Sequence, residues 1–146
     1  EIAIQTCAAC SSESPRFIAG LSMGGFAALR LAGQYPERYL AASGHSSVTE
    51  VSQLDQLMEE TRAHWSTAAT SVSVLEALKS AQGKLPALRF DCGLSDIFLQ
   101  PNRQLHQSLL ALGIAHVYEE FEGGHEWPYW QTHLADSLRF FSRTLK

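Results

Sequence analysis

Short apolar segments alternate along this chain of 146 residues with longer segments in which apolar positions recur every three or four residues. The short segments predict four strands, at residues 16–20, 39–43, 88–92 and 114–121. The longer segments predict helices at residues 23–34, 50–62, 71–82, 101–112 and 128–141. Strands that alternate with helices are typical of an α/β protein with a parallel sheet. The pattern therefore predicts a three-layer α/β/α sandwich with about four parallel strands.

The spacing of apolar residues also predicts which side chains of two helices face the core. In the helix at 50–62 these side chains are Val51, Leu54, Leu57 and Met58. In the last helix they are Trp130, Leu134, Leu138 and Phe141.

The composition fits a protein with a packed core and narrows the classes of partner. Hydrophobic residues make up 45% of the chain and charged residues 18%. The net charge is −4, and the 11 Lys and Arg residues form no basic stripe of the kind that binds nucleic acid. No apolar run approaches the roughly 18 residues that span a bilayer, and no secretory leader is visible. We therefore expect no nucleic-acid or membrane partner and a cytoplasmic location.

The strongest chemical motif is Gly-x-Ser-x-Gly at residues 20–24, between the first strand and the first helix. A serine on such a sharp turn has its hydroxyl exposed, and the backbone N–H of the next residue, Met23, can stabilise an oxyanion. We interpret Gly20 and Gly24 as keeping side chains out of the crowded flanks of the turn. A serine that merely caps the helix is the alternative, but it leaves both glycines unexplained. Ser22 is therefore predicted to be a nucleophile.

A serine nucleophile needs a base, and in this arrangement the order along the chain is Ser, then Asp or Glu, then His. Asp96 follows the third predicted strand and His125 follows the fourth. Functional groups of a parallel sheet lie past the carboxyl ends of its strands, as these two do. Asp91 is a rival acid, but it falls inside a strand and should point into the packing of the sheet. We expect Asp96 to orient His125, and His125 to activate Ser22.

The remaining chemistry-bearing residues suggest supporting roles. His45 ends the second predicted strand too early in the chain to be the base, so we expect it to line the acyl pocket. Cys7 and Cys10 have the spacing of a redox motif, but two ordinary thiols or a local disulfide explain them better, and they lack the further ligands of a zinc site. No histidine pair has zinc-binding spacing. We expect no metal and no cofactor.

These motifs together resemble the esterase family that includes esterase D, S-formylglutathione hydrolase, tributyrin esterase and feruloyl esterases. The resemblance extends over most of the chain and is carried by residues 20–29, 35–38, 92–96, 102–103 and 123–130. It implies an α/β-hydrolase fold. It also implies a catalytic triad of Ser22, Asp96 and His125 that hydrolyses small acyl esters or thioesters through an acyl-serine.

The resemblance also implies which segments line the substrate mouth. These are the loop at 43–47 and the segment that holds Trp127 and Trp130, although both tryptophans could instead pack on the sheet as ordinary helical aromatics.

The chain departs from the family before the elbow. Family members have several strands there, and a loop among them donates the second oxyanion N–H, whereas residues 1–15 match nothing expected at that place. We therefore expect residues 1–146 to be one partial catalytic domain, truncated on its N-terminal side. A missing oxyanion donor lowers the rate by about 100- to 1,000-fold, unless a homo-oligomer or a completing chain restores it. An acyltransferase on the same scaffold, or an inactive scaffold that binds or oligomerises, is the alternative function.

Overall fold

A computed structural model describes residues 11, 13–56 and 73–145 of the chain. Within this part, four strands form one sheet: β1 (Phe17–Leu21), β2 (Ala41–His45), β3 (Ala87–Gly93) and β4 (Val117–Phe121). They lie in the order β1-β2-β3-β4, and every neighbouring pair is parallel. The predicted four-stranded parallel sheet is therefore confirmed.

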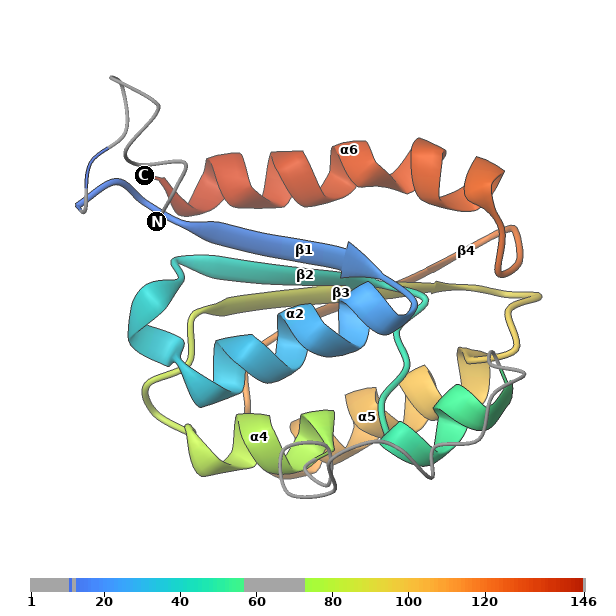
Figure 1. The fold of residues 1–146 in the computed structure, drawn as a ribbon, viewed down its shortest axis with the longest axis horizontal. Helices are drawn as coiled ribbons and strands as arrows, with labels where there is room; N and C mark the ends of the chain where they lie inside the picture. The colour runs from blue at the N-terminus through green and yellow to red at the C-terminus, as the bar shows by residue number, and fades with distance from the viewer. Residues whose placement is uncertain (1–10, 12, 57–72, 146) are drawn as a thin grey trace.

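Helices cover both faces of the sheet. Figure 1 shows α6 (Trp127–Thr144) on one face, and α2 (Met23–Gln34), α4 (Val74–Ser80) and α5 (Leu99–Ala111) on the other. Two short 3₁₀ helices, η1 (Pro36–Arg38) and η2 (Val51–Gln56), lie in the connections. The arrangement confirms the three-layer α/β/α sandwich.

The main core lies between the sheet and the layer of α2, α4 and α5. Leu29 of α2, Leu78 of α4, Phe90 of β3 and Leu109 of α5 are all buried in one cluster. Helix α2 approaches α4 so closely that a Cβ on Gly33 would lie 2.5 Å from the carbonyl carbon of Ala77. The glycine therefore permits a helix contact that a side chain would block.

Two details of the predicted helices differ from the structure. The predicted helix at 50–62 begins as the 3₁₀ helix η2, with Leu54 buried, while Leu57 and Met58 lie outside the described residues. In α6, Leu134 and Leu138 are 51% and 60% exposed, so their prediction as core residues is wrong.

Leu134 and Leu138 are exposed because α6 turns a different stripe of side chains toward the sheet. Its buried residues are Tyr129, Trp130, Ser137 and Phe141, a stripe rotated from the predicted one. Leu134 lies beside this stripe and lines a cavity next to β1, which is an edge strand of the described sheet. A hydrophobic period locates an apolar face, but the partner element decides how much of that face is covered.

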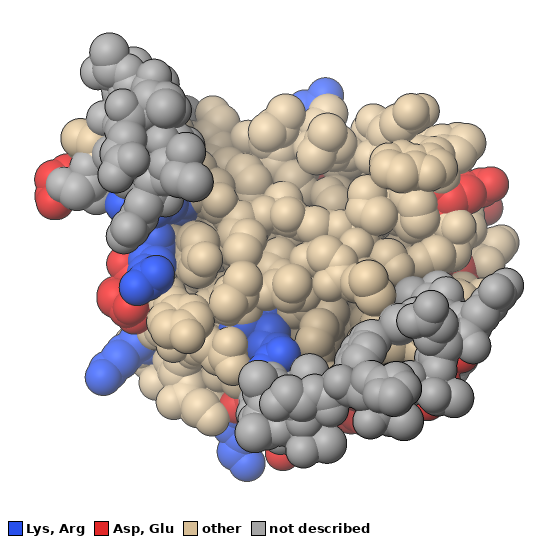
Figure 2. All heavy atoms as spheres, in the orientation of Figure 1, with Lys and Arg blue, Asp and Glu red and all other residues tan. Residues whose placement is uncertain are grey.

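Neither the helices of the described part of the chain nor the face shown in Figure 2 points to a membrane or to one concentrated charge. No helix in the described part of the chain has the length and apolar character to cross a bilayer. On the face shown in Figure 2, acidic and basic side chains lie mostly around the rim, and the middle is largely uncharged.

Cys92 of β3 provides a test of this packing. The side chain is completely buried, and burial, together with the negative charges of Asp96 and Asp91, raises the pKa of its thiol far above the usual range. Because the thiolate is the reactive form, iodoacetamide should leave Cys92 unmodified in the native protein and modify it in concentrated urea. Mass spectrometry of the Cys92 peptide measures both. Native modification at the rate of a free thiol would contradict the packing of β3.

Candidate active site

Ser22 occupies a strained turn between β1 and α2. Its backbone angles are φ 53° and ψ −119°, a region that residues other than glycine rarely adopt. Hydrogen bonds hold the strained residue on both sides: its N–H donates to the His45 carbonyl (2.9 Å), and its carbonyl accepts from the Val48 N–H (3.2 Å). The Ser22 hydroxyl makes no capping hydrogen bond among the described residues. Helix capping therefore does not explain this serine.

The glycines around Ser22 differ in what they permit. A Cβ on Gly20 would lie 2.2 Å from the carbonyl carbon of Gly24, so the strand and the helix can touch only at a glycine. A Cβ on Gly25 would lie 2.3 Å from Ser47 Oγ. A Cβ on Gly24, by contrast, meets no described atom within 4 Å. The prediction that Gly20 occupies a crowded position is confirmed. The same prediction for Gly24 is wrong, because a side chain there would meet open space and only its backbone contacts Gly20.

Ser22, His125 and Asp96 form a continuous hydrogen-bonded chain at the carboxyl ends of the strands. His125 Nε2 lies 2.9 Å from Ser22 Oγ, and His125 Nδ1 lies 3.0 and 3.1 Å from the two Asp96 oxygens. The Asp96 side chain is fully buried, while that of His125 is 15% exposed. Three residues far apart in the sequence are thus within direct reach of one another, and the imidazole between them remains accessible.

The environment of Asp96 favours the ionised carboxylate. Burial by itself raises the pKa of Asp96, but hydrogen bonds from His125 and from the Phe98 N–H (2.8 Å) outweigh it and hold the pKa below its usual value. An ionised carboxylate accepts the Nδ1–H of His125 and so leaves Nε2 as the acceptor for the Ser22 hydroxyl.

Aromatic side chains enclose His125 from two sides. Phe98 and Trp130 each meet the imidazole edge to face, with ring centroids 5.1 and 4.9 Å away. Trp127 packs against Trp130 in the same way, at 5.4 Å, and is 64% exposed. A cavity of about 280 Å³ lies between this pair and β1 and is lined mostly by apolar atoms. Both tryptophans therefore line a hollow that extends to Leu21, the residue before Ser22.

His45 lies in the wall of this hollow, and Met23 lies at the start of α2. His45 contributes to the wall of the cavity, yet only 3% of the residue is exposed, because its ring is turned into polar contacts beneath α6. Met23 is the first residue of α2, so its N–H has no acceptor within the helix and lies at the positive end of the helix dipole.

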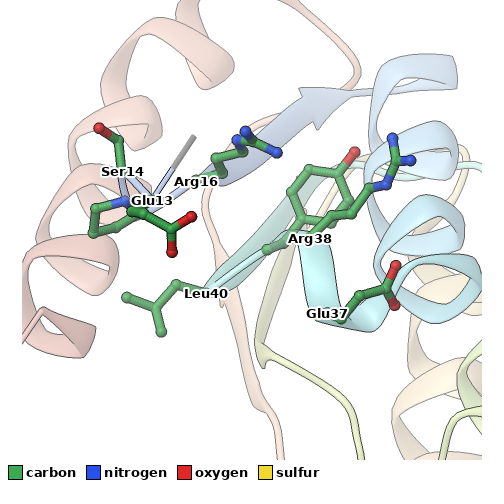
Figure 3. Close-up of a pocket in the computed structure, with 8 residues that line it drawn as sticks. Glu13, Ser14, Arg16, Glu37, Arg38 and Leu40 are labelled. Carbon is green, nitrogen blue, oxygen red and sulfur yellow. The ribbon is translucent and has the colours of Figure 1, made fainter. Parts of the chain in front are cut away.

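A larger hollow lies at the opposite end of the sheet. It has a volume of about 410 Å³ and is lined by Arg16, Arg38 and Leu40, among others (Figure 3). Arg16 and Leu40 come just before β1 and β2, so this hollow is at the amino ends of the strands. Sites of parallel sheets form at the carboxyl ends, where Ser22 and His125 lie.

Sequence reasoning singled out the segments that contain Ser46 and Asn102 but gave neither residue its role in holding the site in place. Ser46 has φ 47° and is completely buried, and its N–H donates to the Asp91 carbonyl (2.8 Å). Asn102 is buried and donates from Nδ2 to the Ser47 carbonyl (2.8 Å) and the Phe98 carbonyl (2.9 Å). Asn102 is a polar residue on the buried side of a helix, which is the signal in the sequence that could have found it.

A serine on a strand-to-helix elbow, hydrogen-bonded to a histidine and through it to an aspartate, defines the class of α/β hydrolases. The family model described as "Putative esterase" matches residues 4–141, which is nearly the whole chain. The chain therefore belongs to this esterase family, as its motifs predict.

Known proteins resemble the chain over most of its length. An acetyl esterase of Caldicellulosiruptor saccharolyticus is 29% identical over 144 residues, an alignment that covers 87% of this chain and 54% of the relative. An S-formylglutathione hydrolase of Staphylococcus aureus superposes with a TM-score of 0.83 at 22% identity, covering 95% of this chain and 59% of that one.

A fluorophosphonate-binding serine hydrolase of the same organism superposes with a TM-score of 0.81 at 22% identity, covering 95% of this chain and 58% of that one. The similarity to these two structures shows a shared α/β-hydrolase fold. The chain spans between 54% and 59% of the length of these three proteins.

The different surroundings of the two elbow glycines make a matched pair of variants. Gly20→Ala should lower the free energy of unfolding by about 3 kcal/mol, because the new methyl group meets backbone that cannot move aside. Gly24→Ala should be neutral or stabilise by roughly 0.5–1 kcal/mol, because it adds a better helix former in open space. Urea unfolding measures both. Equal losses in the two variants would contradict this geometry.

The lowered pKa of Asp96 predicts a pH dependence of stability. The carboxylate stabilises the folded state fully above pH 3.8, its usual value, and this contribution is lost as the pH falls through the lower pKa of the folded state. Asp96→Asn should lower the free energy of unfolding at pH 7 by roughly 1–3 kcal/mol. Urea unfolding between pH 2 and pH 7 should show a smaller loss on acidification in the variant than in the wild type. Parallel curves would contradict the prediction.

Proposed function

We propose that this protein is a serine carboxylesterase that hydrolyses small acyl esters or thioesters through an acyl-serine intermediate. The observation that carries the proposal is the continuous contact from Ser22 Oγ through His125 to the Asp96 carboxylate. Membership of the esterase family supports the reaction class. The bond-making and bond-breaking steps use three side chains of this chain, the substrate and water, with the Met23 backbone N–H as one oxyanion donor.

In the first half of the reaction, His125 Nε2 takes the proton of the Ser22 hydroxyl as Oγ attacks the ester carbonyl. The Met23 N–H donates to the negative oxygen of the tetrahedral intermediate. Collapse of the intermediate breaks the bond to the leaving alcohol or thiol, which receives the proton from His125. The acyl group remains on Ser22.

In the second half, water replaces the alcohol. His125 takes a proton from water as the oxygen attacks the acyl-serine, and then returns that proton to Ser22 Oγ when the acid leaves. Asp96 holds the Nδ1–H of His125 and stabilises the imidazolium that forms in each half. The partial exposure of the His125 side chain gives water a path to the imidazole.

The hollow beside Ser22 is proposed to hold the apolar part of the substrate. Trp127 and Trp130 offer apolar ring faces there, and His45 contributes to the wall. A volume of about 280 Å³ is at the small end of ligand pockets, which favours short acyl or alcohol groups over long chains.

The nucleophile can be tested with a fluorophosphonate probe and with p-nitrophenyl acetate. Ser22→Ala should abolish labelling and lower esterase turnover by at least about 1,000-fold, because no hydroxyl remains to be acylated. Ser142→Ala, which removes an exposed serine of α6, is the matched control and should behave as wild type. Circular dichroism checks that both variants fold.

Unchanged turnover in Ser22→Ala would reject Ser22 as the nucleophile. A folded wild-type protein that the probe does not label would reject the active-enzyme proposal for this chain. Labelling without hydrolysis of the ester, combined with transfer of the acetyl group to an added alcohol, would favour the acyltransferase alternative.

A further inference from the structure

A cluster of buried polar side chains lies between the sheet and α6, directly behind the active site. It consists of Ser43 and His45 of β2, Arg89 and Asp91 of β3, and Ser137 of α6. Each of these residues is at most 3% exposed. We call this cluster the Asp91 ring. Burying so many polar groups is costly unless each is hydrogen-bonded, so their contacts explain how the cluster exists.

The contacts of the Asp91 ring close on themselves. Arg89 Nη1 donates to Ser43 Oγ (3.3 Å), and Ser43 Oγ lies 2.6 Å from Ser137 Oγ. Ser137 Oγ lies 2.7 Å from His45 Nε2, and His45 Nδ1 lies 2.7 Å from Asp91 Oδ2. The same Asp91 oxygen accepts from Arg89 Nη1, which returns to the starting residue.

One arrangement of protons is compatible with every contact of the ring, in which the His45–Asp91 contact is a close ion-pair distance and the others are hydrogen bonds. The Arg89 guanidinium can only donate, so Ser43 accepts from it and gives its own proton to Ser137. Ser137 then gives its proton to His45 Nε2, and the proton of His45 is on Nδ1, facing Asp91. If the proton of His45 were on Nε2, it would be donated to Ser137, and Ser137 would donate to Ser43. The Ser43 hydroxyl proton would then have no acceptor within the ring. A buried network that only one proton arrangement fits resists displacement.

The ring contains the same three residue types as the candidate active site, but it cannot react with a substrate. Ser137 contacts His45, and His45 contacts Asp91, as Ser22 contacts His125 and His125 contacts Asp96. However, Ser137 is completely buried on the side of α6 that faces the sheet. A hydroxyl that meets no solvent meets no ester, so the ring acts through the residues that it holds.

One connection runs from the ring to Ser22. The His45 carbonyl accepts the hydrogen bond from the Ser22 N–H at 2.9 Å. His45 is therefore fixed by its ring nitrogens on one side and holds the strained elbow with its backbone on the other. A movement of His45 would move the acceptor on which the position of Ser22 depends.

A second connection runs from the ring to His125. The Tyr129 hydroxyl donates to Asp91 Oδ1 at 2.7 Å. The Tyr129 ring lies against Gly123, where a Cβ would come within 2.8 Å of its Cδ2 atom. Gly123 has φ 129° and is two residues before His125. Asp91 thus contacts, through one intermediate side chain each, the turn of the nucleophile and the turn of the base.

We propose that the Asp91 ring is a positioning device that sets Ser22 and His125 at hydrogen-bonding distance, with His45, Asp91 and Ser137 as positioning residues. The catalytic part of this proposal rests on the proposed function, whereas the mechanical part does not. The ring bridges β2, β3 and α6, so it couples the two turns across three elements that no local sequence contact joins.

The test compares two serines on the same helix. Ser137→Ala opens the ring, and Ser142→Ala removes an exposed serine outside it. Leu109→Ala, in the core on the other face of the sheet, controls for a general loss of stability. The first measurement is hydrogen exchange of the Ser22 amide relative to that of Ala32 in α2. The second is the rate constant for acylation by a fluorophosphonate, separated from the binding constant of the probe.

Ser137→Ala should accelerate exchange of the Ser22 amide relative to Ala32 by roughly tenfold and lower the acylation rate constant by roughly tenfold, with the probe binding constant unchanged. His45→Asn, which keeps an amide near Asp91 but cannot reach Ser137, should show an effect of similar size. Ser142→Ala should change neither the exchange of the Ser22 amide nor the acylation rate constant. Leu109→Ala should accelerate hydrogen exchange of the Ser22 and Ala32 amides equally.

Two results separate the failure of this proposal from the failure of the proposed function. If the wild type is labelled but Ser137→Ala leaves both readings as in Leu109→Ala, the ring has no positioning role and the esterase proposal stands. If the wild type is not labelled but Ser137→Ala selectively accelerates exchange at Ser22, the esterase proposal fails and the mechanical coupling stands.

Discussion

The active-site edge of this protein depends on the parallel register of β1, β2 and β3. That register pairs Leu21 with His45 and His45 with Asp91, so β1 and β2 end side by side next to Asp91 of β3. The hydrogen bonding continues one residue beyond the strands: the Ser22 N–H donates to the His45 carbonyl, and the Ser46 N–H donates to the Asp91 carbonyl. A register shift of one residue would turn these side chains to the other face of the sheet and separate the elbow from its acceptor.

Strain at the elbow and burial behind it are two parts of one arrangement. Ser22 has a left-handed φ that a free chain would avoid, and such a conformation persists only where its surroundings determine it fully. The surroundings here are the close contact of Gly20 with Gly24 and the backbone bonds to His45 and Val48. The position of the Ser22 hydroxyl therefore depends on backbone contacts that lie behind it.

Burial separates two sets of the same residue types. The chain from Ser22 to Asp96 ends at a partly exposed histidine, whereas the chain from Ser137 to Asp91 is enclosed by α6 and the sheet. Residue types and distances are alike in both sets, so access decides which set can meet an ester. The prediction that Asp91 points into the packing of the sheet is confirmed by this enclosure.

Reading the sequence was enough to predict the alternation of strands and helices, the esterase family, and the candidates Ser22, Asp96 and His125, because each depends on local pattern and order along the chain. Their roles, and the second oxyanion donor expected from elsewhere, stay predictions. The exposure of Leu134 and the enclosure of His45 could be seen only in the folded chain, since both depend on how α6 lies across the sheet. Local periodicity cannot specify which distant element covers a side chain.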